Sequence, residues 1–102
     1  FKDELVYVEL QDIIRLEANS NYTKIYLSDS RSSIESKTLK LYEKILCSPQ
    51  NHFMRVHQSH IVNLNCVIRY LKEEDGIIEM RDYTRIPLSR NRREDFFKWL
   101  GV

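Results

Sequence analysis

Hydrophobic and polar residues alternate along the first half of the chain, and this period of two predicts half-buried β-strands. Three stretches show the pattern, at residues 6–10, 14–18 and 23–27. The side chains expected to share a face are Val6, Val8 and Leu10, then Ile14, Leu16 and Ala18, and finally Thr23, Ile25 and Leu27. Asn19-Ser20-Asn21 predicts a turn between the last two stretches, because Asn and Ser side chains bond nearby backbone groups. A second turn at residues 28–30 leads to a weaker strand at residues 32–35.

The spacing then becomes helical, with Leu39, Tyr42 and Leu46 on one side and lysines elsewhere, and Pro49 is expected to end this helix. Strand patterns return at residues 53–56, 67–71 and 77–80. Asp75-Gly76, before the last of these, is typical of a hairpin turn. Ile86-Pro87-Leu88 predicts a short strand, and its proline favours the edge of a sheet.

A closing helix is expected after residue 88. Ser89 or Asn91 would cap it, and Asn91 with Glu94 has the spacing of a capping box. The helix would bury Phe96 or Phe97 together with Leu100, and it would end at Gly101. The pattern therefore predicts one mainly β domain over residues 1–102 with two short helices. Because strand-like residues follow Phe1 almost at once, we expect this domain to be cut from a longer protein.

Composition and charge narrow the function. The chain has 16 Lys and Arg against 15 Asp and Glu, so any nucleic-acid binding must come from a local patch. No run approaches the roughly 20 apolar residues of a membrane helix. The two cysteines lack CxxC spacing, which favours a reducing compartment, and we expect a cytoplasmic protein.

One segment, residues 44–72, contains no Asp or Glu, although all three histidines lie in it together with Arg55 and Arg69. Within it, residues 53–63 place polar side chains inside a strand pattern. Such a segment suits an anionic partner, because each cation is expected to neutralise a phosphate with no carboxylate competing for it.

Catalytic and metal chemistry find little support. His52, His57 and His60 lie near Cys47 and Cys66, but the paired ligands of structural zinc sites are missing. The histidine-rich segment has no acid and no nucleophile elbow. The two glycines of the chain form no phosphate-binding loop. We therefore expect neither an enzyme nor a bound metal or cofactor.

Two further segments carry polar side chains suited to nucleic acid. Ser89-Arg90-Asn91-Arg92-Arg93 lies where a strand passes into a helix, so its N–H groups and arginines suit phosphate or the edge of guanine. The alternative is a solvated helix face, with Arg92 and Arg93 near Glu94 and Asp95. The turn at residues 19–24 offers Asn for adenine and Lys for phosphate, although Asn-rich turns are also common for conformational reasons and Tyr22 also fits a half-buried strand position.

Together these segments resemble the LytTR DNA-binding domain. The motifs that carry the resemblance, in the family's order, are Glu17-Ala18-x-x-Asn21-Tyr22-Thr23-Lys24-Ile25-Tyr26-Leu27, Ser36-Lys37-Thr38-Leu39, Phe53-x-Arg55-Val56-His57-x-Ser59-x-Ile61-Val62-Asn63 and Ile86-Pro87-Leu88-Ser89-Arg90. They cover nearly the whole chain. At Gln58 many members have Arg or Asn, and since Gln pairs with adenine, the departure leaves the base preference open.

The resemblance implies an elongated stack of small antiparallel β-sheets with two short α-helices. It further implies the output module of a bacterial response regulator, behind a receiver domain, that binds double-stranded DNA as two protomers on paired direct repeats. In this family loops enter the major grooves in place of a recognition helix. By this likeness the base-reading candidates are Asn21, Tyr22, His57, Gln58 and Arg90. The phosphate candidates are Lys24, Lys37, Arg55, Ser89, Arg92 and Arg93.

Some of these residues have competing explanations. For Asn63 and Arg55 we favour a structural role, because buried or turn polar groups usually satisfy backbone hydrogen bonds. His57 remains open between reading a base and supporting the strand. An alternative to DNA binding is a protein-interaction or ligand-sensing β module, which the modest charge and Tyr7, Tyr26 and Tyr83 would suit. An RNA-binding sheet would need aromatic residues regularly placed on one face, and here they are scattered.

Overall fold

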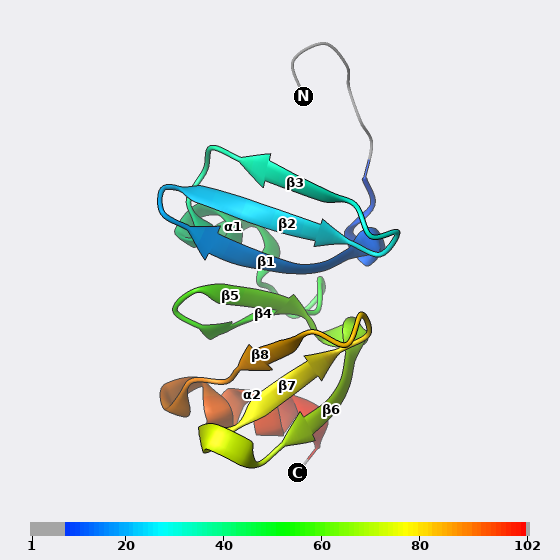
Figure 1. The fold of residues 1–102 in the computed structure, drawn as a ribbon. Coiled ribbons are helices and arrows are strands. Elements are labelled where there is room, and N and C mark those ends of the chain that lie inside the picture. The colour runs from blue at the N-terminus through cyan, green and yellow to red at the C-terminus, as the bar shows by residue number, and fades with distance from the viewer. Residues whose placement is uncertain (1–7, 102) are drawn as a thin grey trace.

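Two antiparallel β-sheets stack end to end in the computed structural model, which describes residues 8–101 (Figure 1). The described part measures 45 × 25 × 25 Å. The larger sheet has the strand order β3-β2-β1-β5-β4, and the smaller has β6-β7-β8. The strands of the larger sheet are β1 (Ile13–Asn19), β2 (Tyr22–Leu27), β3 (Ser32–Glu35), β4 (Phe53–His57) and β5 (His60–Asn63). Those of the smaller are β6 (Val67–Leu71), β7 (Ile77–Met80) and β8 (Arg85–Pro87). The predicted elongated stack of small sheets is thus confirmed.

Two helices and four short 3₁₀ turns complete the chain. Helix α1 spans Leu39–Leu46 and α2 spans Arg93–Leu100. The 3₁₀ turns are η1 (Leu10–Asp12), η2 (Leu64–Cys66), η3 (Glu73–Asp75) and η4 (Arg90–Arg92). Both helices lie behind the sheets in the view of Figure 1. No helix among residues 8–101 has the length and apolar character needed to span a membrane.

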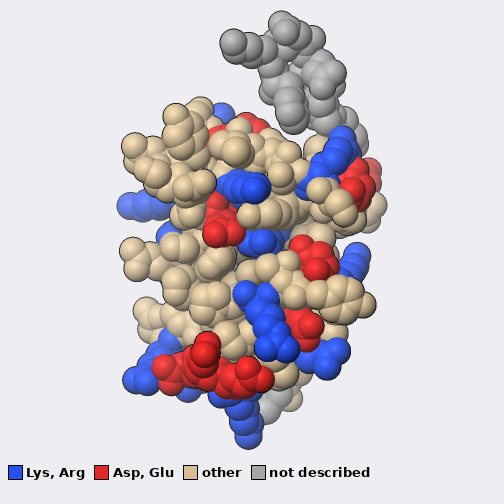
Figure 2. All heavy atoms as spheres, in the orientation of Figure 1, with Lys and Arg blue, Asp and Glu red and all other residues tan. Residues whose placement is uncertain are grey.

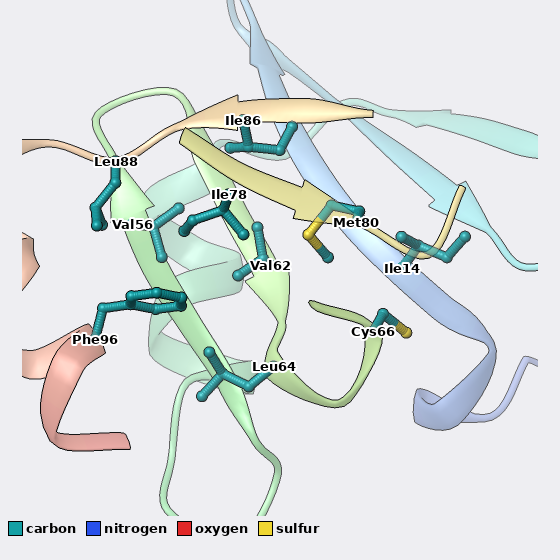
Figure 3. Close-up of a cluster of buried hydrophobic side chains, with 10 residues drawn as sticks. All are labelled: Ile14, Val56, Val62, Leu64, Cys66, Ile78, Met80, Ile86, Leu88 and Phe96. Carbon is teal, nitrogen blue, oxygen red and sulfur yellow. The ribbon is translucent and has the colours of Figure 1, made fainter. Parts of the chain in front are cut away.

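The β4–β5 hairpin lies between two hydrophobic cores. One core joins the larger sheet to α1 and contains Ile13, Leu16, Leu27, Leu39, Leu46, Phe53 and Ile61. The other joins the two sheets to α2 and contains Ile14, Val56, Val62, Leu64, Cys66, Ile78, Met80, Ile86, Leu88 and Phe96 (Figure 3). Because neighbouring residues of a strand point to opposite faces, Ile61 enters the first core and Val62 the second. The hairpin is therefore fixed from both sides.

The predicted shared face of Ile14, Leu16 and Ala18 is wrong at Ile14. The pairing of β1 with β2 shifts register between Ile13 and Arg15. Such a bulge inserts a residue and changes the face on which the following side chains lie. Ile14 consequently packs in the core with α2, whereas Leu16 packs in the core with α1 and Ala18 lies against it.

The first predicted strand is also wrong in its described part. Val8 lies outside any element, and Leu10, which begins η1, is 40% exposed. Val6 lies outside the described residues. The other predicted strands are confirmed, and Pro87 lies on the edge strand β8 as expected.

Both predicted helices form, but the second begins differently. Thr38 caps α1, its side chain accepting a hydrogen bond from the backbone N–H of Leu41. The predicted cap of α2 is wrong, because Ser89 Oγ donates to Asn91 Oδ1 (2.7 Å) and neither side chain caps a helix start. The C-terminal prediction is confirmed, since Gly101 ends α2 in the left-handed conformation, at φ 83°. Phe96 is fully buried, but the expected burial of Leu100 is wrong, because this residue is 40% exposed.

Candidate nucleic-acid interface

Three loops that carry the polar candidates lie along one edge of the molecule. They are the β1–β2 turn at residues 19–22, the β4–β5 turn at residues 57–60 and the β8–η4 passage at residues 88–90. In Figure 1 all three lie on the left, and we call this side the loop edge. The N–H of Ala18 donates to the carbonyl of Ser59 (2.9 Å), and the N–H of Ser89 donates to that of Val56 (2.8 Å). These backbone bonds hold the second loop to each of its neighbours.

The β1–β2 turn presents Asn21 and Tyr22. Both are exposed, and 52% of Tyr22 is accessible, so the alternative of a half-buried strand position is wrong for Tyr22. The turn is tight, with Ser20 at a positive φ of 59°. Lys24 follows on β2, where its ammonium lies 5.0 Å from the centre of the Tyr26 ring. The turn thus offers an amide, a phenol and a cation at the loop edge.

At the β4–β5 turn, Gln58 is exposed and His57 is half-buried. The backbone N–H of Ser59 donates to His57 Nδ1 (3.1 Å), so the neutral imidazole carries its proton on Nε2. The His60 ring lies 5.4 Å from that of His57. Burial lowers the pKa of His60 to about 4, so this side chain is neutral at pH 7. His60 therefore adds no positive charge to this turn at pH 7.

Arg55 supports the tip of the same turn from behind. Its Nη2 donates to the carbonyl of Gln58 (2.5 Å), and its Nε donates to that of His57 (3.4 Å). Its Nη1 donates to Glu43 Oε1 on α1 (2.8 Å), and only 17% of the Arg55 side chain is exposed. This geometry agrees with the structural role favoured from the sequence.

The Asn63 side chain likewise forms its hydrogen bonds with backbone groups. It is 3% exposed, its amide donates to the carbonyl of Ile13 (2.9 Å), and its oxygen accepts from the N–H of Asn65 (3.0 Å). Since Ile13 begins β1, the side chain bridges two strands and satisfies groups that would otherwise be unpaired. Asn63 therefore lies in the interior and away from the loop edge.

The third loop presents Arg90, whose side chain is 77% exposed. Its Nη2 donates to Asp75 Oδ1 on η3 (3.0 Å). Arg93 Nη2 donates to the main-chain carbonyl of Asp75, and Arg92 Nη1 lies 3.8 Å from Glu43 Oε2. The expected proximity of Arg92 and Arg93 to Glu94 and Asp95 yields no ion pair in the described part of the chain.

Lys37 lies in the connection from β3 to α1, which reaches the same side of the molecule in Figure 1. Thr23 Oγ1 on β2 donates to the main-chain carbonyl of Lys37 (2.7 Å), and the lysine side chain is exposed. Figure 2 shows Lys and Arg atoms above and below a stretch of mostly uncharged atoms on the left border, with Asp and Glu atoms beside the lower ones. The loop edge therefore carries cations at both of its ends, and acids accompany them at the lower end.

The expectation that no carboxylate competes for the cations of residues 44–72 is wrong. Arg55 pairs with Glu43, and Arg69 Nε lies 2.9 Å from Glu79 Oε1 on β7. Strand pairing and helix packing place acids from other segments beside these cations. A segment without Asp or Glu in the sequence is therefore not free of neighbouring acids in the folded protein.

Sequence reasoning missed two acids, Glu43 and Asp75, that fix the arginines of the loops. They lie 12 and 15 residues from Arg55 and Arg90, and no local spacing marks them as partners. As for metals, residues 8–101 contain no group of three or more His, Cys, Asp or Glu side chains placed to hold an ion. Of the tyrosines cited for a protein-interaction module, Tyr26 lies half-buried under the Arg15 guanidinium (3.7 Å), Tyr83 is 75% exposed, and Tyr7 lies outside the described residues.

Known proteins share both the sequence and the fold. The family model described as the LytTr DNA-binding domain matches residues 3–101. The heme-containing CO-sensing transcriptional regulator RcoM 2 of Paraburkholderia xenovorans is 29% identical over an alignment of 104 residues that covers 99% of this chain and 38% of that protein. The sensory transduction protein LytT of Bacillus subtilis is 29% identical over an alignment of 106 residues that covers 98% of this chain and 41% of that protein.

The fold is similar to that of a solved LytTr DNA-binding domain from Bacillus cereus, with a TM-score of 0.83 and 25% identity. That likeness covers 100% of this chain and 93% of the solved one. The chain thus spans about two fifths of the length of the two regulators it matches and nearly all of the solved domain.

Proposed function

This chain belongs to the LytTR DNA-binding domain family, and from that premise we propose that it reads the sequence of double-stranded DNA with the three loops of its loop edge. The family model describes a DNA-binding domain and not a catalytic one. The observation that carries the proposal is the alignment of the three polar loops on one side, tied together by the bonds from Ala18 to Ser59 and from Ser89 to Val56.

The dimensions of the molecule support this mode of binding. Neighbouring strands of a sheet are about 4.8 Å apart, so the first two turns, two strands apart, are separated by about 10 Å. The long axis of 45 Å exceeds the roughly 34 Å of one turn of B-DNA. A row of loops on such a frame reaches into the grooves along one side of a duplex, where loop tips contact base edges and flanking cations contact phosphates.

Each exposed tip has a chemistry suited to bases. Arg90 presents a guanidinium that matches the O6 and N7 atoms of guanine, and Gln58 presents an amide that matches adenine. Asn21 and Tyr22 supply an amide and a phenol at the first loop, and His57 supplies the Nε2 proton at the second. We assign Lys24, Lys37, Ser89, Arg92 and Arg93 to the phosphates. Arg55 is better explained as the support of the second loop, because its donors already serve Glu43 and two carbonyls.

The experiment is a selection of bound duplexes from a randomised pool, followed by anisotropy titrations of the selected duplex and a scrambled one. Arg90→Ala is expected to weaken binding to the selected duplex by about 1–3 kcal/mol and to change the scrambled one little. Lys24→Ala should weaken both and reduce the salt slope by about 1, because a phosphate contact carries no sequence information. Failure to enrich any sequence, or equal losses on both duplexes for Arg90→Ala, would refute this reading.

The proposal extends to the longer protein around this chain. Because the matched regulators are more than twice as long as this chain, we propose that it forms the output part of a longer cytoplasmic response regulator with a receiver domain. We further propose that two protomers bind paired direct repeats. Sedimentation of the chain with duplexes bearing one or two copies of the selected site tests this, since a complex that stays at one protomer on two copies contradicts it.

A further inference from the structure

We propose that Asp75 is a positioning residue for DNA recognition, which holds the Arg90 guanidinium in the orientation that reads a base. The inference rests on the base-reading role proposed above for Arg90. Asp75 belongs to η3, a turn between β6 and β7, whereas Arg90 begins η4 after β8. The two meet through Asp75 Oδ1 and Arg90 Nη2 at 3.0 Å.

The contact leaves the arginine able to read a base while it is held. A guanidinium has five N–H donors, and both of its flat edges present two parallel donors. Asp75 occupies one proton of Nη2, and no other acceptor for Arg90 is present among residues 8–101. One complete edge therefore remains free for the O6 and N7 atoms of guanine. The carboxylate supports the arginine without blocking it.

The turn that carries Asp75 is itself fixed in place. The N–H of Gly76 donates to the carbonyl of Glu73 (2.7 Å), and the N–H of Leu88 donates to that of Gly76 (3.1 Å), which ties the turn to the third loop. Arg93 adds its bond to the main-chain carbonyl of Asp75. These bonds place an acid on this turn beside the start of η4.

The backbone at this turn is strained. Glu74 has φ 47° and Asp75 has φ 70°, both in the left-handed region that glycine or asparagine occupies more easily. Gly76 follows at φ 117°, and a Cβ there would meet the Tyr70 ring at 3.0 Å. Strained backbone conformations gather at sites where they serve function, and here one of the two residues in that conformation, Asp75, is the one that contacts Arg90.

Two physical consequences of the acid oppose each other. Its negative charge repels any DNA phosphate nearby, which weakens specific and non-specific binding by similar factors. Its bond to Arg90 restricts a long, 77% exposed side chain before DNA arrives, so less rotamer freedom is lost when the base is bound. Only the second effect favours the selected sequence. Positioning by Asp75 therefore raises the ratio of specific to non-specific affinity.

A competing acid would act in the opposite direction. If Arg90 had to leave Asp75 to reach DNA, removal of the acid would strengthen the specific complex at least as much as the non-specific one. The affinity ratio would then rise or stay constant. The sign of the change in this ratio separates a positioning acid from a competing one.

The test measures the affinity of Asp75→Asn for the selected duplex and for the scrambled duplex at one salt concentration. Asparagine accepts the left-handed backbone and removes the charge, so the fold is preserved. We expect the ratio of the two affinities to fall about two- to fivefold, the range that an exposed ion pair supports. Asp75→Gly, which also relaxes the backbone, should lower the ratio at least as far. A ratio that is unchanged or raised in both variants overturns the proposal.

Glu74→Gln is the matched control, because it removes the same charge from the neighbouring position. Glu74 makes no ion pair within the described residues, so this variant should strengthen both complexes alike and leave the ratio constant. A fall of the ratio equal to that of Asp75→Asn would overturn the proposal, since a general charge effect would then explain both.

The Arg90→Ala background separates this proposal from the one it rests on. There, Asp75→Asn should no longer change the ratio, because the group that it positions is gone. If Arg90→Ala itself leaves the ratio unchanged, base reading by Arg90 fails and positioning fails with it. If Arg90→Ala lowers the ratio but Asp75→Asn does not, only positioning fails.

Discussion

Replacement of Arg55 by methionine tests whether this arginine supports the second loop or contacts DNA. The variant keeps most of the aliphatic stem and removes the guanidinium, which serves Glu43 and the carbonyls of His57 and Gln58. The carboxylate bond at 2.8 Å and the Gln58 bond are both short, whereas the His57 bond at 3.4 Å lies near the limit of a hydrogen bond. The loss thus amounts to about two effective charge-assisted hydrogen bonds.

The magnitude follows from the burial of this group. Hydrogen bonds to charged groups contribute about 1.5–3 kcal/mol each when buried. Arg55 is 17% exposed and Glu43 is 31% exposed, so solvent screening reduces that value. We expect the free energy of unfolding to fall by about 2–3 kcal/mol in urea titrations, with the dependence on denaturant unchanged.

The same variant gives a second measurement that a phosphate contact would alter. Each phosphate contact contributes about 1 to the slope of log affinity against log salt concentration, so the slope should stay constant if Arg55 is structural. Arg69→Met is the matched control, because Arg69 pairs with Glu79 while 58% exposed. It should cost no more than about 1 kcal/mol. Unchanged stability for Arg55→Met together with a slope reduced by about 1 would refute the supporting role.

Two further outcomes follow from buried polar groups. Asn63→Ala removes the bonds to Ile13 and Asn65 and leaves a buried carbonyl without its partner, so the free energy of unfolding should fall by about 2–3 kcal/mol in urea; a loss below about 0.5 kcal/mol would contradict this. Burial lowers the pKa of His60 from 6.5 to about 4, so the unfolded chain takes up its proton first and stability should fall as the pH drops from about 6.5 to about 4. Thermal unfolding of His60→Gln should lack that part of the acid sensitivity, and equal sensitivity in both proteins would show that other groups cause it.

The alternation of apolar residues was sufficient to predict most of the fold, because one face of each strand meets a core. It predicted the wrong face of β1 for Ile14, because a bulge there inserts an extra residue. No residue type in the sequence marks the position of that bulge. It also failed at the start of α2, where Asn91 has capping-box spacing but bonds to Ser89. At this position the geometry of the turn before the helix overrides the capping preference of Asn91.

The candidate site was predictable to the extent that its side chains lie at chain reversals. Polar residues such as Gln58 and Arg90 interrupt apolar patterns, and interruptions of this kind mark the tips of loops. The partners of the arginines were not predictable, because Glu43 and Asp75 approach them only after α1 and η3 have packed. Tertiary contacts between distant segments produce no periodic pattern in the sequence from which they could be predicted.

The spacing of the three loops depends on bonds between main-chain groups, from Ala18 to Ser59 and from Ser89 to Val56. Every residue except proline carries the N–H that such a bond needs. Side chains at the tips are therefore exchangeable without disturbing the frame that carries them, and under the proposed role of Gln58 a new base preference requires only a new residue at that position. The three loops thus keep their spacing whatever side chains their tips carry.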